Sequence, residues 1–248
     1  MQIEFKPILG GPMRMGSNAS EIESAVDQFA YALDTFDPLD VITWFSKQTP
    51  AFGVEVPTFD MAVGLITRGQ FREYERATRL PASELTSGDA DLPVEGISLE
   101  QSMAFCAWIS EVRGEQILLP SEAEWEYAAS SRGRYAFPWG NDWDPHRVNT
   151  ADAGPGYATK TGDFTRGRSA EGIEDLAGNL EEWTRTPYQP YPGGSLVRDR
   201  IFKEQGPGYH VLRGGSYTLY GDLCLAKRRH GFTANYAVTG LRIVRHLA

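Results

Sequence analysis

The residues from Ser98 to Gly114 have the spacing and the end signals of an amphipathic helix. Ser98 is a suitable N-cap, Gln101 completes a capping box with it, and Gly114 is a typical helix terminator. The apolar positions recur every three to four residues, at Leu99, Met103, Cys106 and Ile109. This period predicts a helix with one face in the core, and it makes Cys106 a core residue rather than a reactive thiol.

A second helix is predicted from Ser121 to Ser130. Ser121 and Glu124 form another capping box at its start. Trp125 and Ala128 fall on one side of this helix, three residues apart. We expect both side chains to face inward, because large apolar residues on one helical face are usually buried.

The rest of the chain consists of shorter elements. A strand-like run from Val54 to Leu65 precedes a possible helix from Thr67 to Ala77, and a weaker helical pattern extends from Ser20 to Leu33. From Val211 to Val244 we predict short strands at each end with an irregular middle, because a Gly-Gly pair and many small polar residues disfavour a helix. The segment from Asn18 to Ala51 interrupts an otherwise continuous domain and is interpreted as an insertion packed on the body.

The composition is typical of a loop-rich globular protein. Among 248 residues, 41% are hydrophobic, while 26 Gly, 15 Pro and 12% aromatic residues favour short elements with aromatic anchors. No apolar stretch approaches the roughly 20 residues that span a bilayer, and the first residues lack a signal-peptide pattern. We therefore expect one domain without a membrane span, and we prefer a cytoplasmic location over a virion-associated or surface-associated one.

Charge and motifs exclude several functions. The net charge of −9 argues against a nucleic-acid partner, because phosphate binding requires a dense Lys/Arg surface. The sequence contains neither the phosphate-binding motif GxxxxGK[ST] nor the hydrolase motif GxSxG. Its four histidines lack metal-ligand spacing, and its two cysteines cannot provide a disulfide framework.

Eight short phrases occur along the chain between about Gly10 and Arg245. They are Met15–Ser17, Val56–Pro57 with Ile66–Phe71, Pro93–Ser98, Leu119–Ala128, Pro138–Gly140, Asp175–Asn179 with Glu182–Trp183, Leu212–Ser216 and Gly240–Arg242. In this order they resemble the formylglycine-generating-enzyme or sulfatase-modifying-factor family. The resemblance implies an α+β, C-type-lectin-like fold, loop-rich with few regular elements, as a single domain over residues 1–248 with an insertion at about 18–51.

Most of these phrases are interpreted as structural. The tryptophans Trp125, Trp139 and Trp183 are suited to anchoring a loop-rich core. Arg213 and Arg242 are expected to pair with buried carboxylates or carbonyls.

The resemblance also implies two structural calcium sites. The first comprises carboxylates and main-chain carbonyls at Asp175, Gly178, Leu180 and Glu182, and the second Asn149 and Thr150 with loop oxygens near Asp152 or Gly154. Calcium prefers hard oxygen ligands from closely spaced loop residues, so these ions would fix loops rather than activate water. The alternative for the first set is a capped turn in which both acids accept hydrogen bonds from backbone amides.

Family members that oxidise a substrate cysteine bind copper(I) with two cysteines that follow an Arg-Gly-Gly-Ser phrase. When Arg213 to Ser216 is matched to that phrase, Cys224 takes the second cysteine position and Leu219 takes the first. Leucine cannot ligate copper, so this chemistry is not expected, and we lean towards a protein that is not an enzyme. An enzymatic alternative, with copper or iron, would use Cys224 with Ser216, Tyr220 or His230. The nearby cations Lys227, Arg228 and Arg229 would favour the thiolate of Cys224.

The tail is also similar to the variable segment of diversity-generating retroelement variable proteins. That segment follows the same Arg-Gly-Gly-Ser phrase and closes with Gly-(Phe/Leu)-Arg, and between Tyr217 and Thr239 only Lys227 departs from the expected side-chain types. The predicted ligand-binding residues are Tyr217, Thr218, Leu219, Tyr220, Asp222, Leu223, His230, Phe232, Asn235, Tyr236 and Val238. Exposed aromatic and adaptable side chains on loops form binding surfaces, whereas the competing interpretation packs these residues in the core.

Three functions therefore follow from the sequence. The preferred one is a non-catalytic protein that binds a protein or a small ligand at its C-terminal surface. The alternative is a metal-dependent oxidative enzyme of the formylglycine-generating or sulfoxide-synthase type that uses Cys224. The third is a purely structural or accessory member of the family.

Overall fold

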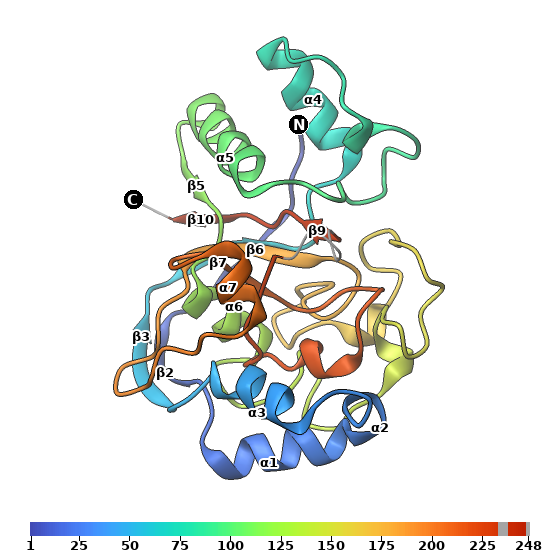
Figure 1. Ribbon diagram of the computed structural model, residues 1–248. Coiled ribbons are helices and arrows are strands. Elements are labelled where there is room, and N and C mark those ends of the chain that lie inside the picture. The colour runs from blue at the N-terminus through green and yellow to red at the C-terminus, as the bar shows by residue number, and fades with distance from the viewer. Residues whose placement is uncertain (233–237, 247–248) are drawn as a thin grey trace.

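The computed structural model describes residues 1–232 and 238–246 and consists of helices and short strands joined by loops (Figure 1). The helices are α1 (Ala19–Gln28), α2 (Ala30–Leu33), α3 (Pro38–Ser46), α4 (Arg68–Thr78), α5 (Leu99–Arg113), α6 (Glu122–Ala129) and α7 (Arg200–Gln205). The strands are β1 (Phe5–Ile8), β2 (Gly11–Met15), β3 (Phe52–Val56), β4 (Phe59–Ala62), β5 (Gln116–Leu118), β6 (Glu181–Pro187), β7 (His210–Arg213), β8 (His230–Gly231), β9 (Thr239–Gly240) and β10 (Val244–His246). This mixture confirms the predicted α+β class, and within the described residues no helix is long and apolar enough to cross a membrane.

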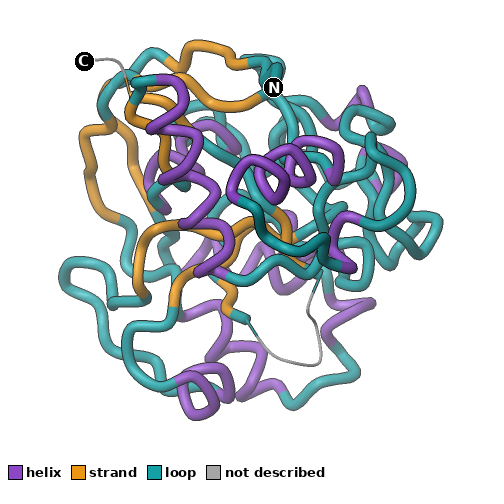
Figure 2. The backbone as a smooth tube through the Cα atoms, turned by 90° about the horizontal axis from the view of Figure 1, so that it is seen from above, coloured by secondary structure: helices purple, strands orange, loops and turns teal. Residues whose placement is uncertain are grey.

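The strands form three small sheets. The first has the order β1-β4-β10-β5, the second pairs β2 with β3, and the third has the order β8-β7-β6-β9. In the first sheet β10 lies between β4 and β5, so that Val244 pairs with Met61 on one side and with Leu118 on the other. Seen from above, long loops connect these short strands (Figure 2). The end of the chain is therefore required to complete a sheet that begins near its start.

Both regions in which strands were predicted contain strands, but one of them holds two strands instead of one. The run from Val54 to Leu65 is not one strand but is divided between β3 and β4 around Pro57, which lacks an N–H for a sheet ladder. The tail has short strands at its ends, β7 and β10, as expected. The helix predicted from Thr67 is confirmed as α4, with a capping box between Thr67 and Gln70.

Helix α5 confirms the predicted caps and buries Cys106 and Ile109 of the predicted apolar face, but not Met103. Ser98 accepts a hydrogen bond from the Gln101 N–H, and Gly114 ends the helix in a left-handed conformation. Met103, however, is 52% exposed, whereas Phe105 is fully buried. Phe105, which the predicted apolar spacing did not include, stacks on Phe71 of α4.

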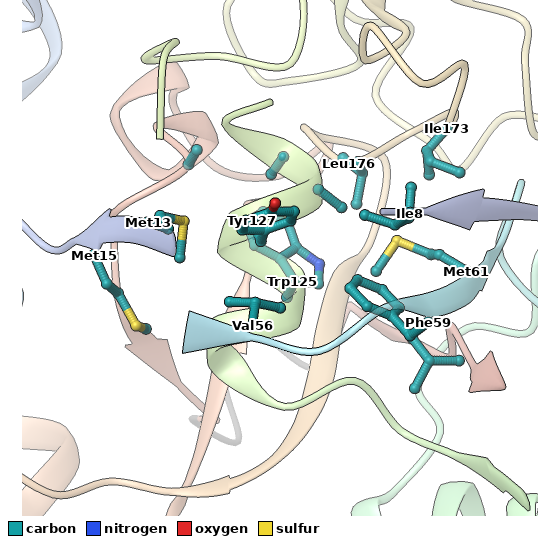
Figure 3. Close-up of a cluster of buried hydrophobic side chains, with 14 of the residues drawn as sticks. Ile8, Met13, Met15, Val56, Phe59, Met61, Trp125, Tyr127, Ile173 and Leu176 are labelled. Atoms are coloured by element: carbon teal, nitrogen blue, oxygen red, sulfur yellow. The ribbon is translucent and has the colours of Figure 1, made fainter. Parts of the chain in front are cut away.

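Helix α6 packs into one of the two large apolar clusters of the described residues. Trp125 and Ala128 are fully buried, as predicted, and Figure 3 shows Trp125 and Tyr127 among residues from β1 to β4, including Ile8 and Val56. The helix is nevertheless not amphipathic, because its three glutamates are buried as well. Buried carboxylates require cationic or hydrogen-bonding partners, and the fold supplies them.

Buried arginines provide these partners. Arg213 Nη2 lies 2.8 Å from Glu122 Oε1 and 2.8 Å from Glu126 Oε2, and Arg242 Nη2 lies 2.7 Å from Glu182 Oε1. All five side chains are essentially inaccessible to solvent. The predicted pairing of Arg213 and Arg242 with buried carboxylates is therefore confirmed.

Residues 18–51 form three helices that leave and re-enter the body at neighbouring points. They connect β2 to β3, which pair directly, with Met15 opposite Phe52. Phe29 and Phe45 pack against Phe137 of the body in one apolar cluster. Figure 1 shows α1, α2 and α3 together at one end of the molecule, with α4 and α5 at the other. Helix α3 was not predicted, because the weak helical pattern was followed only to Leu33.

Candidate functional site

A two-glycine turn after β7 directs the C-terminal segment. Gly214 and Gly215 have φ values of 95° and 68°. A Cβ atom at Gly214 would lie 3.2 Å from Trp125, and one at Gly215 would lie 3.1 Å from Leu223. Glycine is needed at both positions because a side chain would combine an unfavourable φ with crowding. The chain then enters a short 3₁₀ turn at Gly221–Cys224.

A cavity of about 290 Å³ lies between this segment, the insertion helices and α7. Five predicted ligand-binding residues line it: Leu219, Tyr220, Asp222, Leu223 and His230. The other lining residues are Leu33, Phe36, Asp40, Trp44, Lys47, Arg200, Ile201 and Arg228. In Figure 1, α3 lies beside the orange-red C-terminal segment that forms the opposite wall. The site is thus assembled from parts of the chain that are far apart in sequence.

The other predicted ligand-binding residues that the structure describes do not line this cavity. Tyr217 is half-buried and donates a hydrogen bond to Glu95 (2.6 Å), and burial followed by Glu95 raises the pKa of Tyr217 to about 12. Thr218 is exposed, and its hydroxyl lies 3.1 Å from that of Ser216. These residues lie beside the cavity wall rather than within it.

Two further predicted residues are placed elsewhere. Phe232 stacks on Trp183 and lines a separate cavity of about 410 Å³. Val238 is buried with Leu65 and Leu180, and Asp222 and Leu223 are buried too, so the prediction of exposed ligand-binding side chains is wrong at these three positions. Asn235 and Tyr236 lie outside the described residues.

Ion pairs hold the polar side chains of the cavity in place. Lys47 Nζ lies 2.8 Å from Asp199, and Arg228 Nη2 lies 2.9 Å from Asp222. Burial lowers the pKa of Lys47 to about 8, against the opposing effect of Asp199. His230 Nδ1 lies 2.6 Å from Glu181, which leaves Nε2 as the ring nitrogen for a ligand. These groups can therefore orient a ligand without carrying an unbalanced charge.

The cysteine of this segment is not poised for reaction. Cys224 is fully buried, and burial, followed by Asp222, raises the pKa of its thiol well above the ordinary value. The neighbouring cations have other partners: Lys227 pairs with Glu21, Arg228 with Asp222 and Arg229 with Glu122. The environment therefore disfavours the thiolate that the enzymatic alternative requires. Ser216 is buried too, and both Cys224 and Cys106 are free thiols.

The first set of calcium positions does not fit the ion. Both oxygens of Glu182 accept hydrogen bonds, Oε1 from Arg242 and Oε2 from Arg242 and from Trp125 Nε1 (2.8 Å). Asp175 accepts a hydrogen bond from Asn179, and burial raises its pKa to about 7. In the described part of the chain, no three His, Cys, Asp or Glu side chains are grouped as metal ligands. Gly178 and Leu180, whose main-chain carbonyls complete the predicted set, are both buried.

The second set fits an oxygen-coordinated ion better. Asn149 Oδ1 is buried and has no hydrogen-bond partner among the residues that the structure describes, while its Nδ2 donates to the Tyr157 carbonyl. The Thr150 carbonyl accepts a hydrogen bond from the Gly154 N–H (2.8 Å). A Cβ atom at Gly154 would lie only 2.2 Å from Asn149 Oδ1, so glycine leaves room beside that oxygen. An unpartnered amide oxygen beside a carbonyl is a suitable start for a calcium site.

The sequence did not predict that residues of the insertion line one side of the cavity. Phe36, Asp40 and Trp44 belong to a segment whose role was unknown, and Ile201 belongs to a helix that was not predicted. The signal that could have indicated them is the aromatic content of residues 36–45, which include Phe36, Trp44 and Phe45.

Comparison with known proteins agrees with this architecture. Residues 4–247 match the model of the sulfatase-modifying factor enzyme 1-like domain. Hercynine oxygenase from Mycolicibacterium thermoresistibile is 30% identical over 265 residues, covering 88% of this chain and 57% of that protein. The chain spans 36% to 57% of the length of the hercynine oxygenases that it matches.

Two solved structures share the fold over nearly their whole length. PvdO from Pseudomonas aeruginosa superposes with a TM-score of 0.73 at 19% identity, covering 99% of this chain and 95% of that one. Treponema denticola variable protein 1 superposes with a TM-score of 0.72 at 15% identity and the same coverage. The chain belongs to the sulfatase-modifying factor enzyme 1-like family and has its formylglycine-generating-enzyme-type α+β fold.

Proposed function

We propose that this chain is a non-catalytic, ligand-binding member of its family and that the ligand enters the cavity between the C-terminal segment and α3. One observation carries the proposal. Five residues predicted from the tail converge on the cavity, opposite the aromatic residues Phe36 and Trp44. The cysteine of the same segment, Cys224, is buried away from solvent.

The chemistry of the cavity indicates the kind of ligand. A volume of about 290 Å³ is close to the lower end of small-molecule sites, which start near about 300 Å³. Its walls are mainly apolar and aromatic, and three of its charged groups, Lys47, Asp222 and Arg228, are paired within the protein. A small aromatic or apolar molecule, or one such side chain of a partner protein, fits these walls, with His230 available for one hydrogen bond.

Binding of aromatic fragments tests this function. We expect ligand-observed NMR with a library of small aromatic compounds to identify fragments that bind the wild-type protein. Tyr220→Ala should weaken them about tenfold, because it removes an aromatic contact at the cavity mouth. Tyr157→Ala is the matched control, since Tyr157 is also exposed but lies outside the cavity. Fragments that bind both variants as they bind the wild type would contradict the assignment.

The likeness to hercynine oxygenases favours a second candidate function, a metal-dependent oxidative enzyme. The burial of Cys224 and the leucine at position 219 weigh against a copper(I) or thiol mechanism of the cysteine-oxidising kind. Oxygen consumption with a cysteine-containing peptide and added copper(I) or iron(II) would decide between the two functions. Consumption that is lost in Cys224→Ser would overturn the non-catalytic proposal.

We further propose that Asn149 and Thr150 hold a structural calcium ion. Calcium at about 100-fold excess over its Kd should raise the melting temperature of chelator-treated protein by about 5 °C or more, because it binds only the folded state. The shift should be lost in Asn149→Ala and retained in Asn149→Asp, which keeps an oxygen ligand. An equal shift in the alanine variant, or none in the wild type, would refute the site.

A further inference from the structure

Beside the cavity, the insertion exposes several large apolar side chains. Leu39 is 73% exposed and Ile42 59%, while Phe36 and Tyr220 are 44% exposed each. Four of the eleven exposed large hydrophobic residues that the structure describes fall within residues 31–42. We refer to Tyr31, Phe36, Leu39, Ile42 and Tyr220 together as the α3 surface. Apolar side chains gathered in this way mark an interaction site more often than scattered ones do.

The α3 surface is continuous with the cavity. On α3, Asp40 and Trp44 are four residues apart and both line the cavity, while Leu39 and Ile42 occupy the solvent-facing side of the same helix. Phe36 belongs to both the surface and the cavity, because it lines the cavity and remains exposed. The centroids of the Phe36 and Trp44 rings lie 5.1 Å apart. A partner on the surface can therefore place a side chain in the cavity.

The same segment carries much of the negative charge of the protein. Residues 18–51 contain six carboxylates and one basic residue, which gives −5 of the chain's −9. The basic residue, Lys47, is buried against Asp199 and does not neutralise the surface. Among the described residues, the only carboxylate of the segment in a salt bridge is Glu21. The exposed carboxylates are Glu23, Asp27, Asp34, Asp37 and Asp40.

We propose that the α3 surface binds a basic segment of a partner protein, which inserts an aromatic or apolar side chain into the cavity. The proposal rests on the ligand-binding function above and names its partner class. Positive charge in the partner would complement the carboxylates and speed association, and the apolar anchor would supply most of the affinity. A second copy of this chain is a poor occupant, because the exposed carboxylates of the two insertions would repel each other.

Three labelled peptides of equal length provide the test, with binding followed by fluorescence anisotropy. The first peptide combines Lys residues with Trp and Leu, the second replaces Lys by Glu, and the third replaces Trp and Leu by Ser. We expect the first to bind at least about tenfold more tightly than the others. Its affinity should fall between about 0.05 M and about 0.5 M salt, because exposed charges are then screened.

Surface variants locate the binding. Leu39→Ser with Ile42→Ser should weaken the basic apolar peptide about tenfold, and Asp34→Asn with Asp40→Asn about threefold. Asp37 is left unchanged because it caps α3. The matched control is Met103→Ser with Val112→Ser, which removes two exposed apolar residues from α5 at the other end of the molecule. This control should bind as the wild type does.

Each other outcome overturns the proposal in a distinguishable way. If aromatic fragments bind the cavity but none of the peptides binds, the partner class is wrong and the ligand-binding function stands. If neither fragments nor peptides bind, both proposals fail. If the purified chain dimerises and the Leu39→Ser/Ile42→Ser variant does not, a second copy covers the surface. Equal weakening in the α5 control would show non-specific adsorption.

Discussion

Replacing Arg213 with alanine is expected to lower the free energy of unfolding by about 3–5 kcal/mol, which is the usual cost of leaving buried charges without their partner. Arg213 contacts Glu122 and Glu126 and donates a hydrogen bond to the Ala226 carbonyl (2.6 Å). Glu122 would retain Arg229, but Glu126 would keep only the Gly16 N–H among its partners in the described part of the chain. Equilibrium urea denaturation of both proteins measures the loss.

The pH dependence of this loss of stability shows whether the unpaired charge of Glu126 causes it. Burial raises the pKa of Glu126 above its ordinary value even with Arg213 present, and removal of the arginine should raise it further. A carboxyl group with a raised pKa in the folded state stabilises the fold at low pH and loses this contribution as the pH rises. The deficit of Arg213→Ala should therefore shrink as the pH is lowered from about 7 to about 5.

Two companion variants make the test specific. Adding Glu126→Gln to Arg213→Ala removes the stranded charge and should recover part of the lost stability. Arg166→Ala should cost less than about 0.5 kcal/mol, because its side chain is 67% exposed and its ion pair with Asp144 is at the surface. If Arg213→Ala behaved like Arg166→Ala, the buried pairs would not stabilise the fold.

Replacing Trp125 with alanine should cost about 3–5 kcal/mol, because it opens a cavity in the central apolar cluster. Trp125 is fully buried on α6, between Ile8 and Val56 of the neighbouring strands in the same cluster. The loss again follows from urea denaturation. A domain of ordinary stability, about 5–15 kcal/mol, would lose a large fraction of it.

Trp125→Phe separates packing from hydrogen bonding. Phenylalanine retains most of the volume but lacks the Nε1–H that Trp125 donates to Glu182 (2.8 Å). Glu182 keeps Arg242, so we expect a smaller loss of about 1–3 kcal/mol. Equal losses in the two variants would show that the hydrogen bond, rather than the filled volume, accounts for the effect of Trp125.

The candidate site was only partly predictable. Leu219, Tyr220 and His230 could be identified because the tail follows a recognisable Arg-Gly-Gly-Ser phrase. Whether these side chains are exposed could not be predicted from the sequence, because Val238 in the same stretch packs into a buried cluster while Tyr220 remains exposed. Side-chain composition indicates which residues are suited to binding, but burial depends on what packs against them.

Local structure was determined by the sequence alone wherever both partners of an interaction lie within one turn. The capping boxes of Ser98 with Gln101 and of Ser121 with Glu124 each join residues three positions apart, so these helix starts could be read directly. Only the tertiary structure decided how the elements meet. Arg229 reaches Glu122 across 107 positions, and the cavity joins α3 to the tail. Such contacts depend on chain topology and on competition for burial, which no local pattern encodes.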